Sequence, residues 1–319
     1  MITFIKHFLT SFFTAKELSK RKNFKKFIEI FNVRFFYAFN FVRQKFNKRI
    51  KFLSNTNSEN MLNEINVQSN LIVRDLNSKG FNDDFKLNEK IFNNILDEIS
   101  LKNSSLSYKG LKKTELFDNE VNSNDNIKTI IQKSIKNQLS HVTLDINMSK
   151  LNSLKQIATS KFFSEIANSY LGCEDISVAS LCYISNPVKI SEKEKKDNAQ
   201  YYHYDNDFKK FFKVFIYLND VDINSGPHSF IQYSHKKKLY KHIVSKRIND
   251  DEIKKCYGRE NIITFDRPKG SIIFEDTFGL HKGNYPKSQS RAVLILIYGI
   301  GQGIGLYNNS INISNAINH

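Results

Sequence analysis

Apolar residues recur along this chain with two different periods. Over residues 151–170 they are spaced by three and four, which predicts one amphipathic helix, and Gly172 stands where a helix C-cap is expected. After Gly172 the period becomes two, which predicts strands. These strand-like runs are rich in β-branched and aromatic residues and are separated by turn residues; they span 178–184, 211–218, 230–233, 271–274 and 292–298.

The preceding region is more polar, and we expect helices alternating with loops. Residues 71–76 predict a strand or turn before Gly80, and Ile91, Ile95 and Ile99 predict a helix. Several short strands in a C-terminal half of this size are typical of a sandwich or jelly roll. Stretches rich in Ser, Asn and Asp, or in charge, predict loops at 54–60, 104–108, 119–126 and 191–197.

The N-terminal segment has a pattern of its own. Its apolar residues lie at steps of three and four between basic ones, which predicts a basic amphipathic helix that either packs on the main domain or a partner, or lies on an anionic membrane surface. No apolar run reaches the roughly 18 residues of a spanning helix, and no cleavage site suggests a signal peptide. The apolar stripe consists of Phe24, Phe27, Ile28, Phe31, Phe35, Phe39, Val42 and Phe46.

Charge is concentrated in the same segment. Residues 1–51 carry thirteen Lys and Arg against Glu17 and Glu29, or +11 of the overall +16. The rest of the chain is only mildly basic, so a nucleic-acid footprint over the whole protein is not expected. Cys173, Cys182 and Cys256 are odd in number and widely spaced, which does not suit a disulfide framework and favours a reducing, cytoplasmic compartment, with the N-terminal segment as a peripheral membrane contact.

One constellation suggests a chemistry. His203 and Asp205 are one residue apart, so on an extended segment their side chains share a face. His281 follows a later strand, and Arg291 begins the last one. Two imidazoles and one carboxylate are the ligands of a facial Fe(II) triad with open positions. A His-x-acid pair is expected roughly once by chance in such a composition, so its weight comes from the order of the strands around it.

The same residues lie in motifs that resemble a known family. Gln200-Tyr-Tyr-His-Tyr-Asp, Lys213-Val-Phe-Ile-Tyr-Leu-Asn-Asp-Val, Ser225-Gly-Pro-His-Ser, and Gly270 through Gly283 resemble the phytanoyl-CoA dioxygenase family of Fe(II)/2-oxoglutarate oxygenases. The resemblance covers about residues 70–300. It implies an α+β fold with a double-stranded β-helix (a cupin-like jelly roll), flanking helices, and the basic helical extension outside it.

By that resemblance His203, Asp205 and His281 would bind Fe(II), and Arg291 would bind the distal carboxylate of 2-oxoglutarate. O2 would be the oxidant, and hydroxylation of a small-molecule, lipid or sugar-like substrate would be coupled to decarboxylation of 2-oxoglutarate. Family members often carry Ser two residues after the distal His, where this chain has Gly283. We therefore expect Arg291 to work with another group, Tyr183 or Lys213.

The remaining histidines and aromatics are expected to play other parts. His228 and His235 are expected in a loop and at a strand end, away from the metal, and His141, His242 and His319 have no partner signal. The aromatic residues that flank the triad either line its pocket or pack in the core. They are Tyr202, Tyr204, Phe208, Phe211 and Phe278.

The predicted organisation is an extension over 1–52 and an oxygenase domain over 53–319, with a helical lead-in at 60–172 and a jelly-roll core at about 175–300. Polar, basic loops at 192–198 and 236–261 suit an anionic or carrier-attached substrate. Two alternatives stay open: a jelly roll that binds without turnover, and a membrane or partner adaptor that works through the N-terminal helix.

Overall fold

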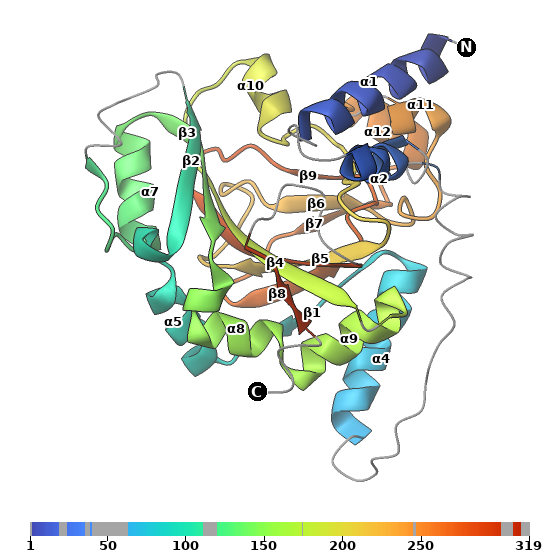
Figure 1. Cartoon of the computed structure of the whole chain (residues 1–319). Helices are drawn as coiled ribbons and strands as arrows, with labels where there is room; N and C mark the ends of the chain where they lie inside the picture. The colour runs from blue at the N-terminus through green and yellow to red at the C-terminus, as the bar shows by residue number, and fades with distance from the viewer. Residues whose placement is uncertain are drawn as a thin grey trace.

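The computed structural model describes residues 2–18, 24–35, 39, 63–110, 120–173, 175–244, 247–300 and 309–313 (Figure 1). Two antiparallel sheets face each other, and helices cover the outer face of the larger one. The part of the predicted stripe beyond Phe39 and the predicted loop at 54–60 lie outside the described residues.

The larger sheet has eight strands in the order β1-β8-β5-β10-β4-β3-β2, with β11 paired to β4. Its centre is the long β10, which pairs with β5 on one side and β4 on the other. Its strands are β1 (Phe81–Lys86), β2 (Ser104–Gly110), β3 (Leu139–Ile146), β4 (Ile176–Ser185), β5 (Phe211–Tyr217), β8 (Ser271–Glu275), β10 (Arg291–Ile300) and β11 (Ile311–Asn312).

The smaller sheet has the order β7-β6-β9 and packs against the inner face of the larger one. An isolated bridge from His203 to His281 extends this sheet beyond β9 by one short extended segment. The three strands are β6 (His228–Ile231), β7 (Ile262–Phe265) and β9 (His281–Gly283).

Alternation of side chains along the central strands separates two cores. On β5, Phe212 and Val214 face the helices, whereas Phe211 and Phe215 face the smaller sheet. Successive residues of a strand point to opposite faces, so every second position of β4, β5 and β10 faces the space between the sheets. The chain's period-two pattern therefore decides which side chains can reach a site there.

Helices cover the outer face of the larger sheet. In Figure 1, α4, α8 and α9 lie at the end of the molecule opposite the N-terminal helices. Helix α9 ends at Gly172, which adopts φ +74° as the expected C-cap. The covering helices are α4 (Asn63–Ser78), α5 (Glu89–Glu98), α7 (Ile127–Lys136), α8 (Asn152–Ala158) and α9 (Lys161–Leu171), with the short 3-10 turns η1 (Leu101–Asn103) and η2 (Met148–Lys150).

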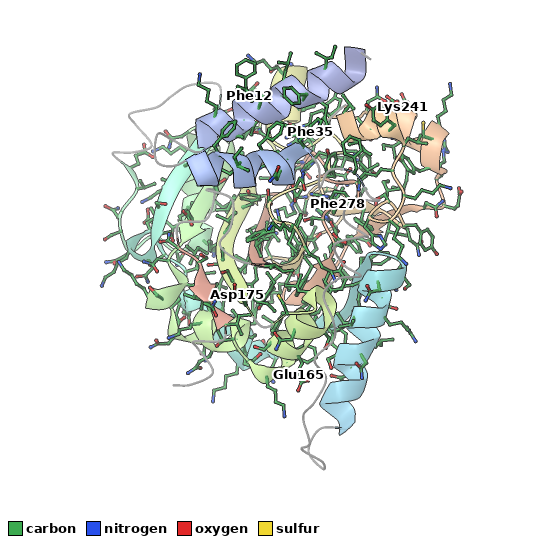
Figure 2. All side chains as sticks on the ribbon, turned by 45° about the vertical axis from the view of Figure 1, so that its right-hand side comes forward. Phe12, Phe35, Glu165, Asp175, Lys241 and Phe278 are labelled. Atoms are coloured by element: carbon green, nitrogen blue, oxygen red, sulfur yellow. The ribbon has the colours of Figure 1, made fainter. Side chains whose placement is uncertain are left out.

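The N-terminal segment forms a helical hairpin of α1 (Ile2–Leu18) and α2 (Phe24–Phe35). Its helices pack through Ala15, Ile30 and an edge-to-face contact between the rings of Phe12 and Phe27. Figure 2 shows the hairpin, with Phe12 and Phe35 labelled, across the same end of the molecule as Lys241. Beside it lie α10 (Glu192–Asp197), α11 (Tyr240–Val244) and α12 (Asp250–Tyr257).

The hairpin also contacts the main body. Helix α1 packs on α11, Phe39 stacks with Tyr240 at 6.3 Å, and Arg34 lies 3.7 Å from Asp207. Of the predicted stripe, the residues from Phe24 to Phe35 lie on α2, and Phe39 lies in a bend. Among the described helices, none combines the length and apolar character needed to cross a bilayer.

Several local predictions for the lead-in were wrong. Residues 71–76 belong to α4, because Ile72 and Leu76 are one helical turn apart and both are fully buried. The lead-in is not purely helical, since it supplies β1, β2 and β3, and the predicted loop at 104–108 lies in β2. These strands carry polar residues on one face, so their sequences lack the continuous apolar runs by which the central strands were predicted.

Two further boundaries differ from expectation. Residues 191–197 are not a loop, because the Ser191 hydroxyl and the Glu194 carboxylate form a reciprocal capping box that begins α10. The single helix expected over 151–170 is two, α8 and α9, with a break at Thr159 and Ser160. No disulfide links the three cysteines, all of which lie in the described part.

Candidate metal centre

The structure brings His203, Asp205 and His281 together between the sheets. The backbone N–H groups of His203 and His281 each donate to the other residue's carbonyl, at 2.9 and 2.8 Å, which fixes the two histidines side by side. The Asp205 N–H donates to the Thr277 carbonyl at 2.8 Å. The Nε2 atoms of His203 and His281 lie 3.9 and 3.4 Å from the Asp205 carboxylate oxygens. One potential ligand atom from each residue therefore faces a common point.

Both imidazoles are oriented by backbone carbonyls. Nδ1 of His203 lies 3.0 Å from the Tyr201 carbonyl, and Nδ1 of His281 lies 3.0 Å from the Gly279 carbonyl. Because a carbonyl only accepts, each Nδ1 carries the proton and donates it. In its neutral form each imidazole then has its lone pair on Nε2, the nitrogen that lies near Asp205. A histidine whose other nitrogen is held in this way is typical of metal ligands.

The charges suit a cation. Burial and the neighbouring His281 hold the pKa of His203 well below its usual range, so that His203 is neutral. Burial opposes ionisation of Asp205, but Lys213 and His281 overcome it and hold its pKa well below the usual range. Burial lowers the pKa of His281, and the Asp205 carboxylate outweighs that effect and raises it. A metal ion that displaced the Nε2 proton of His281 would bind one carboxylate and two neutral imidazoles.

The spacing also fits an ion. Two ligand atoms at about 2.1 Å from a metal and at right angles lie about 3 Å apart. His203 Nε2 lies 3.9 Å from Asp205 Oδ1, and His281 Nε2 lies 3.4 Å from Asp205 Oδ2. Only small shifts of these side chains are needed to reach the spacing around an ion. Two ring nitrogens and one carboxylate form the set typical of a non-heme Fe(II) site.

A second group in the described part of the chain has metal-ligating side chains, His242, Glu252 and Cys256. Here His242 Nε2 lies 3.0 Å from the Glu252 carboxylate, and the Lys241 ammonium lies 2.9 Å from the same carboxylate. The Glu252 side chain is 38% exposed, against 19% for Asp205, and this greater exposure to water makes the second group the weaker cation site.

The three residues expected to contact 2-oxoglutarate line the same cavity of about 420 Å³ as the triad. They are Arg291, Lys213 and Tyr183, each at an inward position of its strand. Burial raises the pKa of Tyr183, so its hydroxyl stays protonated. Lys213 Nζ donates to Asp205 at 2.7 Å and lies 3.2 Å from Asp207.

Gly283 provides the space in which the Arg291 guanidinium lies. A Cβ at position 283 would come within 2.3 Å of Arg291 Nη2. The guanidinium instead donates to the Gly226 carbonyl and lies 3.4 Å from the Ser185 hydroxyl. Ser185 was missed by sequence reasoning, although it faces Arg291 directly in the β4–β10 register.

Sequence reasoning missed further residues around the site. His228 begins β6, lines the cavity, and forms a 2.8 Å hydrogen bond with Glu275. Burial raises the pKa of Glu275 to about 8 and lowers that of His228, so a protonated Glu275 donates to a neutral His228. His141, Arg34 and Arg247 also line the cavity. The expectation that His228 lies in a loop was wrong, because it begins a strand and lies beside His281, with ring centroids 5.5 Å apart, although it is not part of the clustered ligand set. The other three residues lie outside the segments that carry the triad, and no motif pointed to them.

Core packing, one of the two alternatives for the aromatics that flank the triad in sequence, applies to most of them. Of the five aromatics that flank the triad in sequence, Tyr204 lines the cavity. Phe208, Phe211 and Phe278 pack in the core between the sheets, and Tyr202 packs near Ile248. His235 was expected at a strand end, but it is buried in the turn that follows β6, which ends at Ile231, and it does not line the cavity.

Comparisons with known proteins give weak similarities. No family model and no curated protein sequence matches the chain. Among solved structures, the chain is similar to the non-heme alpha ketoglutarate dependent epimerase SnoN from nogalamycin biosynthesis (9% identity, TM-score 0.44, 75% of this chain and 85% of that one). It is also similar to EctD from S. alaskensis, solved with 2-oxoglutarate and 5-hydroxyectoine (12%, 0.45, 79% and 80%). A third is AviO1 from Streptomyces viridochromogenes Tue57 (11%, 0.44, 74% and 96%). These values are too low to assign a function, so the reading of the site depends on its own side chains.

Proposed function

We propose that this protein is an Fe(II)- and 2-oxoglutarate-dependent oxygenase that hydroxylates a small molecule. The observation that carries the proposal is the meeting of His203 Nε2, His281 Nε2 and the Asp205 carboxylate in a cavity that also holds Arg291. Three protein ligands leave about three positions open on a six-coordinate ion. The order β8-β5-β10-β4 facing β7-β6-β9 supports the jelly-roll assignment.

His203, Asp205 and His281 would hold the iron. When bound, Fe(II) with 2-oxoglutarate and O2 supplies the oxidising power to place oxygen in a C–H bond, while 2-oxoglutarate becomes succinate and CO2. The backbone bridge between His203 and His281 holds the two imidazoles at a fixed separation before any ligand arrives. Such preorganisation keeps the open positions directed into the cavity.

Lys213 positions the acidic ligand. By donating to Asp205 Oδ2 it engages one carboxylate oxygen and leaves Oδ1 available to the ion. This arrangement favours a carboxylate that binds through one oxygen. Whether Lys213 and Tyr183 also contact 2-oxoglutarate belongs to the proposal, and both lie on the cavity wall where such contact is feasible.

Arg291 would bind the distal carboxylate of 2-oxoglutarate. Its guanidinium is buried and remains a cation, and a planar guanidinium can pair with a carboxylate through two parallel hydrogen bonds. Ser185 adds a hydroxyl beside it. Phe215, Val293 and Ile295 form an apolar part of the same wall and would exclude water.

Anaerobic titration tests the proposal. Addition of Fe(II) and then 2-oxoglutarate to the full-length protein should produce a visible charge-transfer band, and addition of O2 should yield succinate. His203→Ala should lose both Fe(II) binding and the band. Cys256→Ser is the matched control, because it removes a ligand atom from the second group and should leave both intact. A wild-type protein that binds neither Fe(II) nor 2-oxoglutarate would leave a jelly roll that binds without turnover as the better reading.

A second function is favoured by the surface of the hairpin. Six apolar side chains there are between 37% and 60% exposed, on a segment that carries most of the positive charge. Exposed apolar groups among basic residues are typical of helices that lie on anionic membranes. The wild type should bind phosphatidylserine vesicles at physiological salt, and Phe13→Ser should weaken that binding; no vesicle binding by the wild type would rule this function out. The exposed residues are Ile5, Phe8, Leu9, Phe12, Phe13 and Ile28.

A further inference from the structure

The cavity holds more positive charge than the metal centre and its co-substrate need. Four cations line it, Arg34, Lys213, Arg247 and Arg291, against the carboxylates of Asp197 and Asp205. Since Fe(II) and 2-oxoglutarate carry equal and opposite charges, loading the centre does not change the surplus of two. Asp207, which pairs with Lys213 and Arg34, offsets one of these charges. At least one positive charge remains for another ligand.

Two of the four cations, Arg34 and Arg247, come from outside the sheets. Lys213 is paired with Asp205, and Arg291 is placed to receive 2-oxoglutarate. Arg34 reaches the cavity from α2 of the hairpin, and Arg247 reaches it from the segment between α11 and α12. Both therefore line the cavity without belonging to either sheet.

Arg34 is incompletely paired. Its guanidinium lies 3.7 Å from the Asp207 carboxylate, which is longer than a hydrogen bond, and its side chain is only 16% exposed. Its Nε is buried and has no hydrogen-bond partner among the described residues. A shielded cation with an unused donor is costly and would be stabilised by an anion that supplies acceptors.

Arg247 is exposed at the rim and anchored there. Its Nε donates to the Lys196 carbonyl at 2.8 Å, which fixes the side chain beside α10. After burial and His281, the charge of Arg247 is the next cause that lowers the pKa of His203, so Arg247 lies within electrostatic reach of the metal centre. An anion held at Arg247 would thus lie close to the triad.

We propose that Arg34 and Arg247 together bind an oxyanionic group of the substrate, a carboxylate or a phosphate, and so orient the rest of the substrate toward the metal centre. Guanidinium groups suit both anions because they offer paired donors in one plane. This inference rests on the proposed oxygenase function and adds the substrate class to it. It also makes the N-terminal hairpin part of the substrate site.

Binding of simple anions tests the inference. Full-length protein is loaded anaerobically with Fe(II) and 2-oxoglutarate, and inorganic phosphate or acetate is titrated by calorimetry. Arg34→Gln and Arg247→Gln should each weaken binding of the preferred anion roughly tenfold or more, as expected when one charge-assisted contact is lost. The anion that binds more tightly identifies the group as phosphate or carboxylate. Arg74→Gln, on the exposed face of the distant α4, is the control and should bind as the wild type does.

A substitution at Asp207 separates binding from a structural tie. If Arg34 only fastens the hairpin to the body, Asp207→Asn should reduce anion binding as much as Arg34→Gln does, and that result would overturn the inference. If Arg34 binds the substrate, Asp207→Asn should keep or tighten anion binding, because it removes a competing negative charge. Arg34→Lys should keep part of the affinity for the anion, because lysine retains the positive charge.

The charge-transfer band formed with Fe(II) and 2-oxoglutarate tests the proposed function separately from the anion site. It should be unchanged in every variant of this series. A wild type without the band overturns the oxygenase proposal. A normal band together with anion binding that neither Arg34→Gln nor Arg247→Gln weakens overturns the present inference alone.

Discussion

The fit of Arg291 against Gly283 leads to a prediction about substitutions at position 283. The oxygenase family that the sequence resembles often has Ser at this position, and by that resemblance Gly283→Ser or Gly283→Ala would be harmless. In this protein a Cβ there would come within 2.3 Å of Arg291 Nη2. Ordinary contact needs about 3.5 Å, so the guanidinium must move by roughly 1 Å.

Such a movement should cost affinity for 2-oxoglutarate. A charge-assisted hydrogen bond is worth about 1.5–3 kcal/mol, so loss of one Arg291 contact should raise the Kd about tenfold to a hundredfold. Fe(II) binding should be unchanged, because the triad is separate from this contact. The assay is the anaerobic titration of 2-oxoglutarate at saturating Fe(II), followed by the charge-transfer band, with wild type and Gly283→Ala compared.

A double-mutant cycle shows whether the effect passes through Arg291. In an Arg291→Gln background, Gly283→Ala should add little further loss, since the side chain it displaces is already gone. Wild-type affinity in Gly283→Ala, or fully additive losses in the double variant, would refute the steric reasoning.

Three other predictions concern the body of the protein. Leu296→Ala removes a fully buried side chain from β10 and should lower the free energy of unfolding by about 2–5 kcal/mol in guanidinium denaturation; a change below 1 kcal/mol would contradict the packing described. Burial raises the pKa of Cys182 to about 12, so iodoacetamide should label Cys256 in the native protein and Cys182 only after denaturation, as mass spectrometry would show. Burial raises the pKa of Glu275 to about 8 from an ordinary 4.5, so the native state keeps a proton that the unfolded state loses, and this group's contribution to the stability of the metal-free protein should fall as pH rises from about 5 to 8. Glu275→Gln should flatten that dependence, and an unchanged pH profile in the variant would count against the buried, protonated carboxyl.

The central strands could be predicted from the sequence because they are buried on both faces. The runs 211–217 and 292–298 are apolar apart from Lys213, and the structure has β5 and β10 at those places. The edge strands β1 and β2 are partly polar, and their pairing depends on partners far away in the chain, such as β8 for β1. Local pattern carries little of that information.

The candidate site divides in the same way. The proximity of His203, Asp205 and His281 could be predicted because these residues lie in motifs whose order along the chain is informative. The places of Ser185, His141 and Arg34 could not be predicted. Ser185 and His141 reach the cavity through the pairing of β4 with β10 and β3, and Arg34 reaches it through docking of the hairpin. The register of the sheet, more than the local sequence, decides their place.

That register constrains how the chain can change in length. Tyr183, Lys213 and Arg291 reach the cavity because each lies at an inward position of a paired strand. One residue inserted or deleted within β10 would turn the following side chains to the opposite face and break their alignment with β4 and β5. Relatives of this protein should therefore vary in length between strands, as in 218–227 or 284–290, while insertions within β4, β5 and β10 should be rare.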